Sequence, residues 1–189
     1  MNFKNWFENT DQQNQELKDI VIKFAKENNM PLPTTYLDSG SDAVVFNTTD
    51  NDMVVRITKK DNQNSNFCEK IISKPEIQKT GAVVKVFKHS EYENHLITYK
   101  EKINTDWELF LANKIPDNHI DISEKLLNLV FDFYDHDELQ MSKKIFTLTK
   151  YKETKNVALL ISRIPKLIQD LHSGNLGVNK DGNIVIIDC

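Results

Sequence analysis

The sequence predicts an α+β fold, and three features of the chain carry that prediction. Short β-branched runs separated by turn residues fill residues 37–99, where we expect a five-stranded sheet. Segments in which apolar residues recur at helical spacing follow in residues 107–167. Two short apolar runs, 176–178 and 184–187, then flank the turn residues 181–183 and predict a buried hairpin.

The composition is that of an ordinary folded protein and argues against several functions. Its 189 residues suffice for one compact pair of lobes with a real core. The 24 basic and 28 acidic residues give a formal charge of -4, which argues against a general nucleic-acid or anionic-membrane binder. Cys68 and Cys189 lack the spacing of a disulfide framework or a zinc site. Because no apolar run resembles a signal peptide or a membrane span, we expect a cytoplasmic protein.

An amphipathic helix is predicted over residues 16–26, ahead of the sheet. Its apolar residues follow helical spacing: Leu17, Ile20, Val21, Phe24 and Ala25. Pro31 and Pro33 end the helical pattern. We expect this helix to pack on the domain that follows, and docking to a partner is the alternative.

Two hairpins supply the predicted sheet. In residues 37–46 a turn around Gly40 leads into a β-branched run, and the polar residues 51–52 separate it from a strand at 53–58. The second hairpin joins residues 83–87 to residues 95–99. These two hairpins account for four strands of the five-stranded sheet that we expect.

One helix is predicted between the hairpins, over residues 67–79. Ser65 or Asn66 can cap its start, and Gly81 can end it. Pro75 lies within the segment, so we expect a break or a kink there.

The second half of the chain predicts three helices. They cover residues 107–112, residues 122–133 and residues 156–167. Asp121 or Ser123 is the expected cap of the second.

Three polar side chains near the end of the sequence form a candidate metal and proton-transfer site. Asn175 follows Asp170 by five residues, and Asp188 follows Asn175 by thirteen. Closing the terminal hairpin makes Asn175 and Asp188 neighbours, with Asp170 close by. Carboxylate and amide oxygens suit Mg²⁺, which also takes substrate phosphates as ligands. The alternative is a surface loop that contains these residues by chance.

The same set of side chains is used by protein kinases. The segment Asp170-Leu-His-Ser-Gly-Asn175, with Asp188 after it, resembles the catalytic loop and metal-binding aspartate of the protein-kinase-like superfamily. It resembles aminoglycoside and choline phosphotransferases and small phage or bacterial kinases more than it resembles eukaryotic protein kinases. The resemblance implies that Asp170 takes the proton of an acceptor hydroxyl, and that Asn175 and Asp188 hold Mg²⁺ beside ATP.

The resemblance implies a two-lobed fold with a small five-stranded N-lobe and a truncated helical C-lobe. We therefore expect three regions: an N-terminal helix in 1–33, the N-lobe in 34–102 and a reduced C-lobe in 103–189 that ends in the catalytic-loop hairpin. Cys189 follows Asp188 directly and is the last residue of this sequence, so we expect no counterpart of the family's later helices. We expect the apolar face that they would cover to bind a protein partner or a second copy.

The family binds nucleotide phosphates with a glycine loop and with a lysine that pairs with a helix glutamate. Gly40 and Ser41 occupy the loop here, with one of the three usual glycines, and Arg56 takes the place of the lysine. Arg56 keeps the positive charge, but its guanidinium is longer and wider than an ammonium group. Glu69 is the expected partner of Arg56 in preference to Glu76, because it lies nearer the strand.

The residues after the fifth strand correspond to the hinge of the family. The resemblance places the adenine of ATP against backbone groups near Glu101 and Ile103. Lys100 precedes this hinge, and we expect it to be solvated at the strand end. Two alternatives remain, namely that Lys100 fills the adenine pocket or that it supplies the charge of the missing lysine.

Two functions follow from the resemblance. The first is a minimal phosphotransferase that uses ATP and Mg²⁺ and moves the γ-phosphoryl group to a hydroxyl acceptor, which the intact Asp170, Asn175 and Asp188 support. The second is a catalytically inactive pseudokinase that acts by binding another protein, as an inhibitor, an antitoxin-like protein or a phage counter-defence factor would. The missing lysine, glycines and helices support the second. We expect no nucleic-acid or membrane partner in either case.

Overall fold

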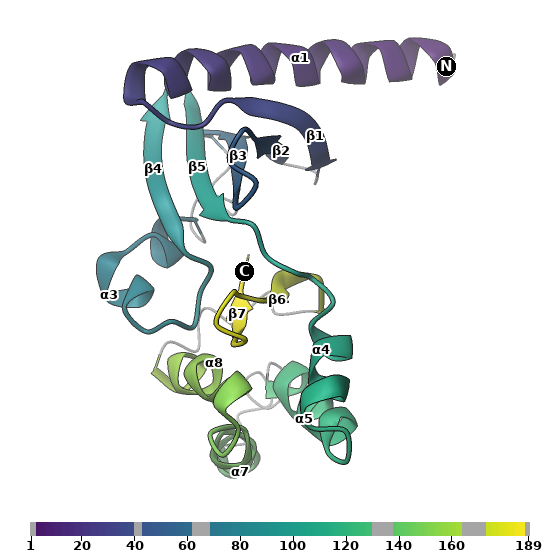
Figure 1. Ribbon diagram of the computed structural model, residues 1–189, viewed down its shortest axis with the longest axis vertical. Helices are drawn as coiled ribbons and strands as arrows, with labels where there is room; N and C mark the ends of the chain where they lie inside the picture. The colour runs from purple at the N-terminus through teal and green to yellow at the C-terminus, as the bar shows by residue number, and fades with distance from the viewer. Residues whose placement is uncertain (1–2, 40–42, 62–68, 130–137, 164–172, 188–189) are drawn as a thin grey trace. The chain divides into compact units, whose positions relative to one another are not determined.

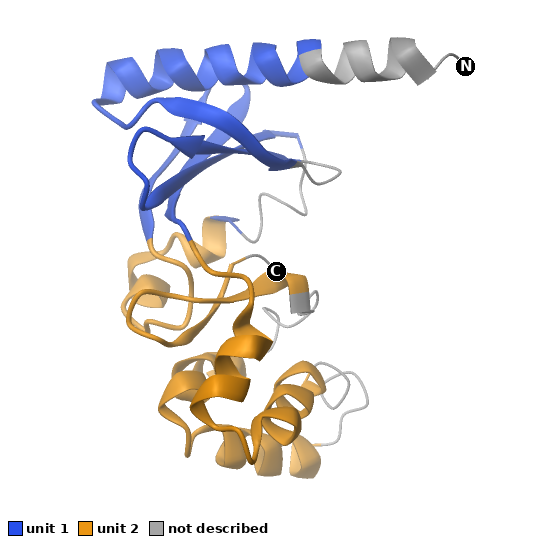
Figure 2. Ribbon diagram, turned by 45° about the vertical axis from the view of Figure 1, so that its right-hand side comes forward, with its two compact units in different colours: residues 1–69, 86–102 blue, residues 70–85, 103–189 orange. Residues whose placement is uncertain are grey.

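A computed structural model describes residues 3–39, 43–61, 69–129, 138–163 and 173–187. The chain falls into two compact units, which Figure 2 shows in blue and orange. Unit 1 comprises residues 1–69 and 86–102, and unit 2 comprises residues 70–85 and 103–189. Each unit combines helices with an antiparallel sheet, so the predicted α+β class is confirmed.

The elements are labelled in Figure 1. Unit 1 contains α1 (Phe3–Asn28), β1 (Pro33–Ser39), β2 (Ala43–Thr48), β3 (Met53–Lys59), β4 (Val86–Tyr92) and β5 (His95–Glu101). Unit 2 contains α3 (Pro75–Gln78), α4 (Trp107–Lys114), α5 (His119–Leu127), α7 (Glu138–Leu148), α8 (Lys152–Arg163), the short helix η2 (Ser173–Asn175), β6 (Leu176–Val178) and β7 (Ile184–Ile186). None of the helices in the described ranges is long and apolar enough to cross a membrane.

The strands of unit 1 form one antiparallel sheet in the order β1-β2-β3-β5-β4, which confirms the predicted five strands. Residues 37–39 were expected in the turn before the first strand, but they end β1. The β4–β5 turn places Glu93 and Asn94 at φ values of 45° and 61°. Positive φ at both central residues is what a type I′ hairpin turn requires.

Strand β4 begins at Val86, so the prediction that it starts at Val83 is wrong. Val83 instead forms a parallel bridge with Ile186 of unit 2, and the Val84 N–H donates to the Ile186 carbonyl at 2.9 Å. The apolar run 83–87 is therefore divided between residues that pair with Ile186 and residues that belong to β4, and the pairing partner of each residue determines the division. A local sequence pattern does not identify that partner.

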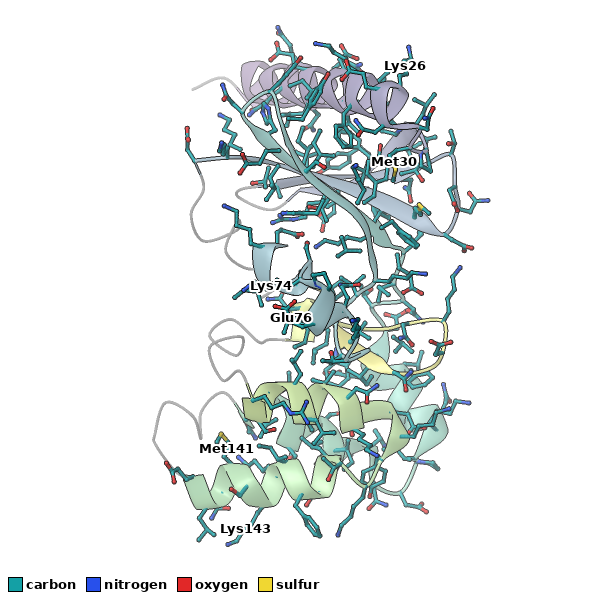
Figure 3. The ribbon with its side chains drawn as sticks, turned by 90° about the vertical axis from the view of Figure 1, so that its left-hand side faces the viewer. Lys26, Met30, Lys74, Glu76, Met141 and Lys143 are labelled. Carbon is teal, nitrogen blue, oxygen red and sulfur yellow. The ribbon has the colours of Figure 1, made fainter. Side chains whose placement is uncertain are left out.

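Helix α1 packs along one face of the sheet (Figure 1). Side chains from α1, β2, β3 and β5 form the core of unit 1: Val21, Phe24, Ala25, Val44, Phe46, Val55, Ile57, Ile97 and Tyr99. On α1 and the loop after it, Lys26 points away from the sheet and Met30 packs against this core (Figure 3). The helix is longer than the predicted 16–26, because residues 3–15 contain no glycine or proline to interrupt it.

The predicted break at Pro75 is confirmed. Helical conformation at residues 69–72 stops before Lys74, which has φ -66° and ψ 134°, and α3 begins at Pro75. Proline disfavours helical conformation in the residue before it, so an extended Lys74 follows from the sequence. Gly81, at φ 66°, lies just after this region.

Unit 2 is built from helices and the β6–β7 hairpin. The hairpin pairs Leu176 with Ile186 and Val178 with Ile184, as predicted, and Gly182 has φ 74° in its turn. Helix α8 packs on β7 and buries one apolar face. It begins at Lys152, four residues before the predicted start. Helix α5 begins at His119, ahead of the predicted caps.

Candidate functional site: a buried ion cluster on the sheet of unit 1

The face of the sheet opposite α1 carries a group of polar side chains. Side chains alternate between the two faces of a strand, and the odd-numbered residues Val55, Ile57, Ile97 and Tyr99 enter the core under α1. Arg56, Thr98 and Lys100 therefore project from the other face. Arg56 lies directly opposite Thr98 in the β3–β5 ladder, and His89 lies opposite Thr98 in the β4–β5 ladder.

Glu69 brings the two cations of this face together. Its Oε1 atom lies 3.2 Å from Arg56 Nη1 and also accepts a hydrogen bond from Lys100 Nζ. The ion pair that the sequence predicts between Arg56 and Glu69 is thus present. Glu76, the other candidate, lies on α3 and is exposed.

All three charged side chains are buried. The side chain of Glu69 is 0% exposed, and those of Arg56 and Lys100 are 9% and 6% exposed. A buried charge is costly unless it is paired, so this cluster depends on each cation being held by the carboxylate. Arg56 and Lys100 with Glu69 give a net charge of +1, since two cations share one anion.

The pKa of Glu69 lies below its ordinary value despite burial. Burial alone would raise the pKa of this carboxyl, because the charged form loses its hydration. The charges of Lys100 and Arg56 and the hydrogen bond from Lys100 outweigh that effect and lower the pKa. The charge of His89 acts in the same direction. Glu69 is therefore an anion at neutral pH.

The two oxygens of Glu69 differ. Oε1 contacts both Arg56 and Lys100, whereas Oε2 is buried and has no hydrogen-bond partner among the described residues. Buried polar atoms are nearly always hydrogen-bonded in folded proteins. Oε2 is therefore an acceptor position that a water or a ligand donor can use.

Lys100 was expected at the solvated end of its strand, and that expectation is wrong. The residue is 5% exposed and lies on the same face as Arg56. The spacing along β5 indicates the face on which Lys100 lies. Lys100 is two residues from Thr98, so both side chains lie on the same face of the strand, and Thr98 pairs with Arg56. Recognising it requires the β3–β5 pairing, which local patterns do not give.

Sequence analysis also missed His89 and Thr98. His89 Nδ1 lies 3.0 Å from Thr98 Oγ1, and Thr98 is 1% exposed. Thr98 lies on β5, between Arg56 on β3 and His89 on β4. No local pattern distinguishes this histidine from a surface residue.

The two predicted hinge residues lie in different units. Glu101 ends β5 in unit 1, where it pairs with Met53 and is half-buried. Ile103 belongs to unit 2, and the next residue, Asn104, forms an antiparallel bridge with Val178 of β6. The hinge segment is thus the neighbour of the terminal hairpin within unit 2.

Gly177 allows that approach. A Cβ atom at this position would lie 2.1 Å from Ile103 Cγ2 and 3.0 Å from the Asn104 carbonyl oxygen. Real Cβ atoms do not approach other atoms so closely, so any other residue would displace the hinge segment. The glycine fixes where Ile103 lies over β6.

Asn175 ends η2, immediately before β6, and is half-buried. Its carbonyl oxygen accepts a hydrogen bond of 2.8 Å from the N–H of Ile187, the residue that precedes Asp188. Four predicted site residues lie outside the described residues: Gly40, Ser41, Asp170 and Asp188. Within the described ranges, no group of three or more His, Cys, Asp or Glu side chains is placed to hold a metal ion.

No protein-family model matches this chain, and no curated protein matches it either.

Proposed function

We propose that this chain is an ATP- and Mg²⁺-binding phosphotransferase with a protein-kinase-like fold, which moves the γ-phosphoryl group to a hydroxyl acceptor. The observation that carries the proposal is the buried cluster of Arg56, Glu69 and Lys100 on a five-stranded antiparallel sheet. Two cations on one buried carboxylate leave an excess positive charge, which an anionic ligand would balance.

Phosphate groups suit this cluster for two physical reasons. Two cations and one anion leave a positive charge in a region shielded from water, where electrostatic attraction is stronger than at the surface. Guanidinium and ammonium groups also form charge-assisted hydrogen bonds to phosphate oxygens. Glu69 holds both side chains in fixed positions, so little entropy would be lost when a phosphate binds.

The proposed transfer needs one base. As the bond forms between the acceptor oxygen and the γ-phosphorus, the bond from that phosphorus to the β–γ bridging oxygen breaks, and ADP leaves. The hydroxyl proton passes to the carboxylate of Asp170. Such transfer depends on positioning and charge stabilisation more than on covalent chemistry.

The donor set for Mg²⁺ is Asn175 and Asp188. An amide oxygen and a carboxylate are the hard oxygen ligands that this ion prefers. When bound, Mg²⁺ would supply charge neutralisation at the phosphates. The hydrogen bond from Ile187 to the carbonyl of Asn175 supports the fit, because it ties the backbone next to Asp188 to the backbone of Asn175.

A second candidate function is that of a pseudokinase that binds another protein. Four large apolar side chains on the helices of unit 2 favour it, because each is more than 60% exposed: Leu109, Ile120, Leu139 and Phe146. A protein partner could bury such side chains where they lie close together on the surface. In this function the ion cluster would serve structure alone.

Thermal unfolding with and without ATP and Mg²⁺ tests the proposal. A ligand at about one hundred times its Kd adds roughly 2.7 kcal/mol to the free energy of unfolding, or about 5 to 10 °C in Tm for a protein of this size. We expect Asp188→Asn to lose the metal-dependent shift. Asp181→Asn is the matched control, since Asp181 is exposed in the turn of the same hairpin.

The absence of any shift at saturating ATP and Mg²⁺ would contradict the proposal and favour the protein-binding function. If a shift occurs, replacing Asp170 by Asn separates the two functions further. Full activity of that variant in a biological assay would exclude phosphoryl transfer, because the base would be gone.

A further inference from the structure

The two buried cations of unit 1 come from neighbouring strands. Arg56 of β3 pairs with Thr98, and Lys100 of β5 pairs with Val54, two positions along each strand. Diagonal neighbours on one face of an antiparallel pair lie about 7 Å apart, within the reach of long side chains. Either cation can therefore reach a ligand that the other reaches.

Arg56 and Lys100 both contact Glu69, but the two contacts differ. Lys100 Nζ donates a hydrogen bond to Oε1, whereas Arg56 Nη1 lies 3.2 Å from the same atom. An ammonium group has three donors and is compact, so one donor can hold the carboxylate while others bind a phosphate oxygen. Lys100 therefore has the chemistry that a lysine paired with a helix glutamate offers.

We propose that Lys100 is the phosphate-binding lysine of the site, supplied by β5, and that Arg56 is a positioning residue that helps to neutralise Glu69. This inference rests on the proposed function, because it names the side chain that binds the phosphates of ATP. It explains how the chain keeps an ammonium group beside the helix carboxylate although β3 carries arginine.

If Lys100 binds the phosphates, a lysine at position 56 of β3 should be able to replace it. In Arg56→Lys/Lys100→Met the single ammonium group is moved to β3 and still lies within reach of Glu69. In Lys100→Met the ammonium group is lost, and only the guanidinium remains. The double variant should therefore bind ATP more tightly than the single variant Lys100→Met.

Calorimetric titration with Mg²⁺-ATP and, separately, with adenosine tests this. We expect Lys100→Met to weaken ATP binding about ten- to a hundredfold, the usual loss for a hydrogen bond to a charged group. Adenosine affinity should change less than about twofold, because adenosine has no phosphate. If Lys100 had a purely structural role, Lys100→Met would lower the affinities for ATP and for adenosine together. Lys102→Met is the control, since Lys102 is exposed on the same segment.

Two further variants keep the test decisive. Lys100→Gln retains a hydrogen-bond donor for Glu69 and half of the aliphatic stem, so it replaces Lys100→Met if that variant does not fold. Arg56→Met should weaken ATP binding less than either substitution at Lys100.

The possible results are distinguishable. If the wild-type protein binds no ATP, the proposed function fails and this inference fails with it. If the wild-type protein binds ATP and both variants of Lys100 bind it equally well, the proposed function stands and this inference is overturned. A selective loss in Arg56→Met would then assign the phosphates to Arg56.

Discussion

Glu69 is completely buried and receives Lys100 on one carboxylate oxygen, although the two residues lie 31 positions apart in the sequence. Arg56 approaches the same oxygen. Because each cation is more than nine-tenths buried, the carboxylate is what makes both charges tolerable. Two consequences of this arrangement can be measured.

Glu69→Gln should destabilise the protein strongly. The substitution keeps the shape of the side chain but leaves two buried cations without a counter-charge, which typically costs about 3 to 5 kcal/mol. Chemical denaturation gives the free energy of unfolding. The matched control is Glu76→Gln, which makes the same change at an exposed position and should alter stability by less than about 0.5 kcal/mol. Equal effects of the two substitutions would show that the cluster contributes nothing.

The stabilisation by Glu69 should depend on pH in the acidic range. The pKa of Glu69 is lower in the folded protein than its ordinary value of 4.5, so below that value the unfolded chain binds more protons than the folded one. The contribution of Glu69 is thus fully present above pH 4.5 and is lost as pH falls through the lower pKa of the folded state. The wild-type protein and Glu69→Gln should therefore converge in stability as the pH falls below 4.5 and through the lower pKa of the folded state. A difference that stays constant between neutral and acidic pH would contradict the ion pairing.

The predictability of the fold differed between its parts. The two hairpins of the sheet and the terminal hairpin follow from apolar runs and turn residues, and the break before Pro75 follows from proline chemistry. Strand β1 was not located from the sequence, because residues 37–39 were assigned to a turn. Helix α7 was not predicted, because among its described residues only Leu148 is buried and its apolar pattern is therefore weak. Boundaries that depend on tertiary pairing, such as the start of β4, were also missed.

The same distinction holds for the site. The pairing of Arg56 with Glu69 was predicted through the resemblance to protein kinases, in which a strand lysine pairs with a helix glutamate. The burial of Lys100 was not, because it depends on β5 lying beside β3 and on a helix residue that covers both strands. His89 was missed for the same reason, since it reaches Thr98 only through the β4–β5 register.

Tyr99→Phe should loosen the N-terminal helix of unit 1. The Tyr99 hydroxyl donates a 3.0 Å hydrogen bond to the carbonyl of Pro31, in the loop after α1. Burial raises the pKa of Tyr99, so the hydroxyl stays protonated and keeps this bond. Its loss should cost about 0.5 to 1.5 kcal/mol.

Hydrogen exchange of α1 and the unfolding free energy together measure this effect, and we expect faster exchange in residues 16–28. Tyr151→Phe serves as the control, since Tyr151 is half-buried and belongs to unit 2, whereas α1 belongs to unit 1. Unchanged exchange in α1 with lower global stability would place the role of the hydroxyl elsewhere.

Gly177→Ala should displace the hinge segment of unit 2. The added Cβ would lie 2.1 Å from Ile103 Cγ2 and 3.0 Å from the Asn104 carbonyl oxygen, so the 103–104 backbone must move away from β6. Overpacking of this kind costs about 1 to 3 kcal/mol. Adding Ile103→Ala removes the closer contact and should restore part of the stability, whereas Ile103→Ala alone should only destabilise. If the double variant were less stable than the sum of the two single changes predicts, the clash would not be with Ile103.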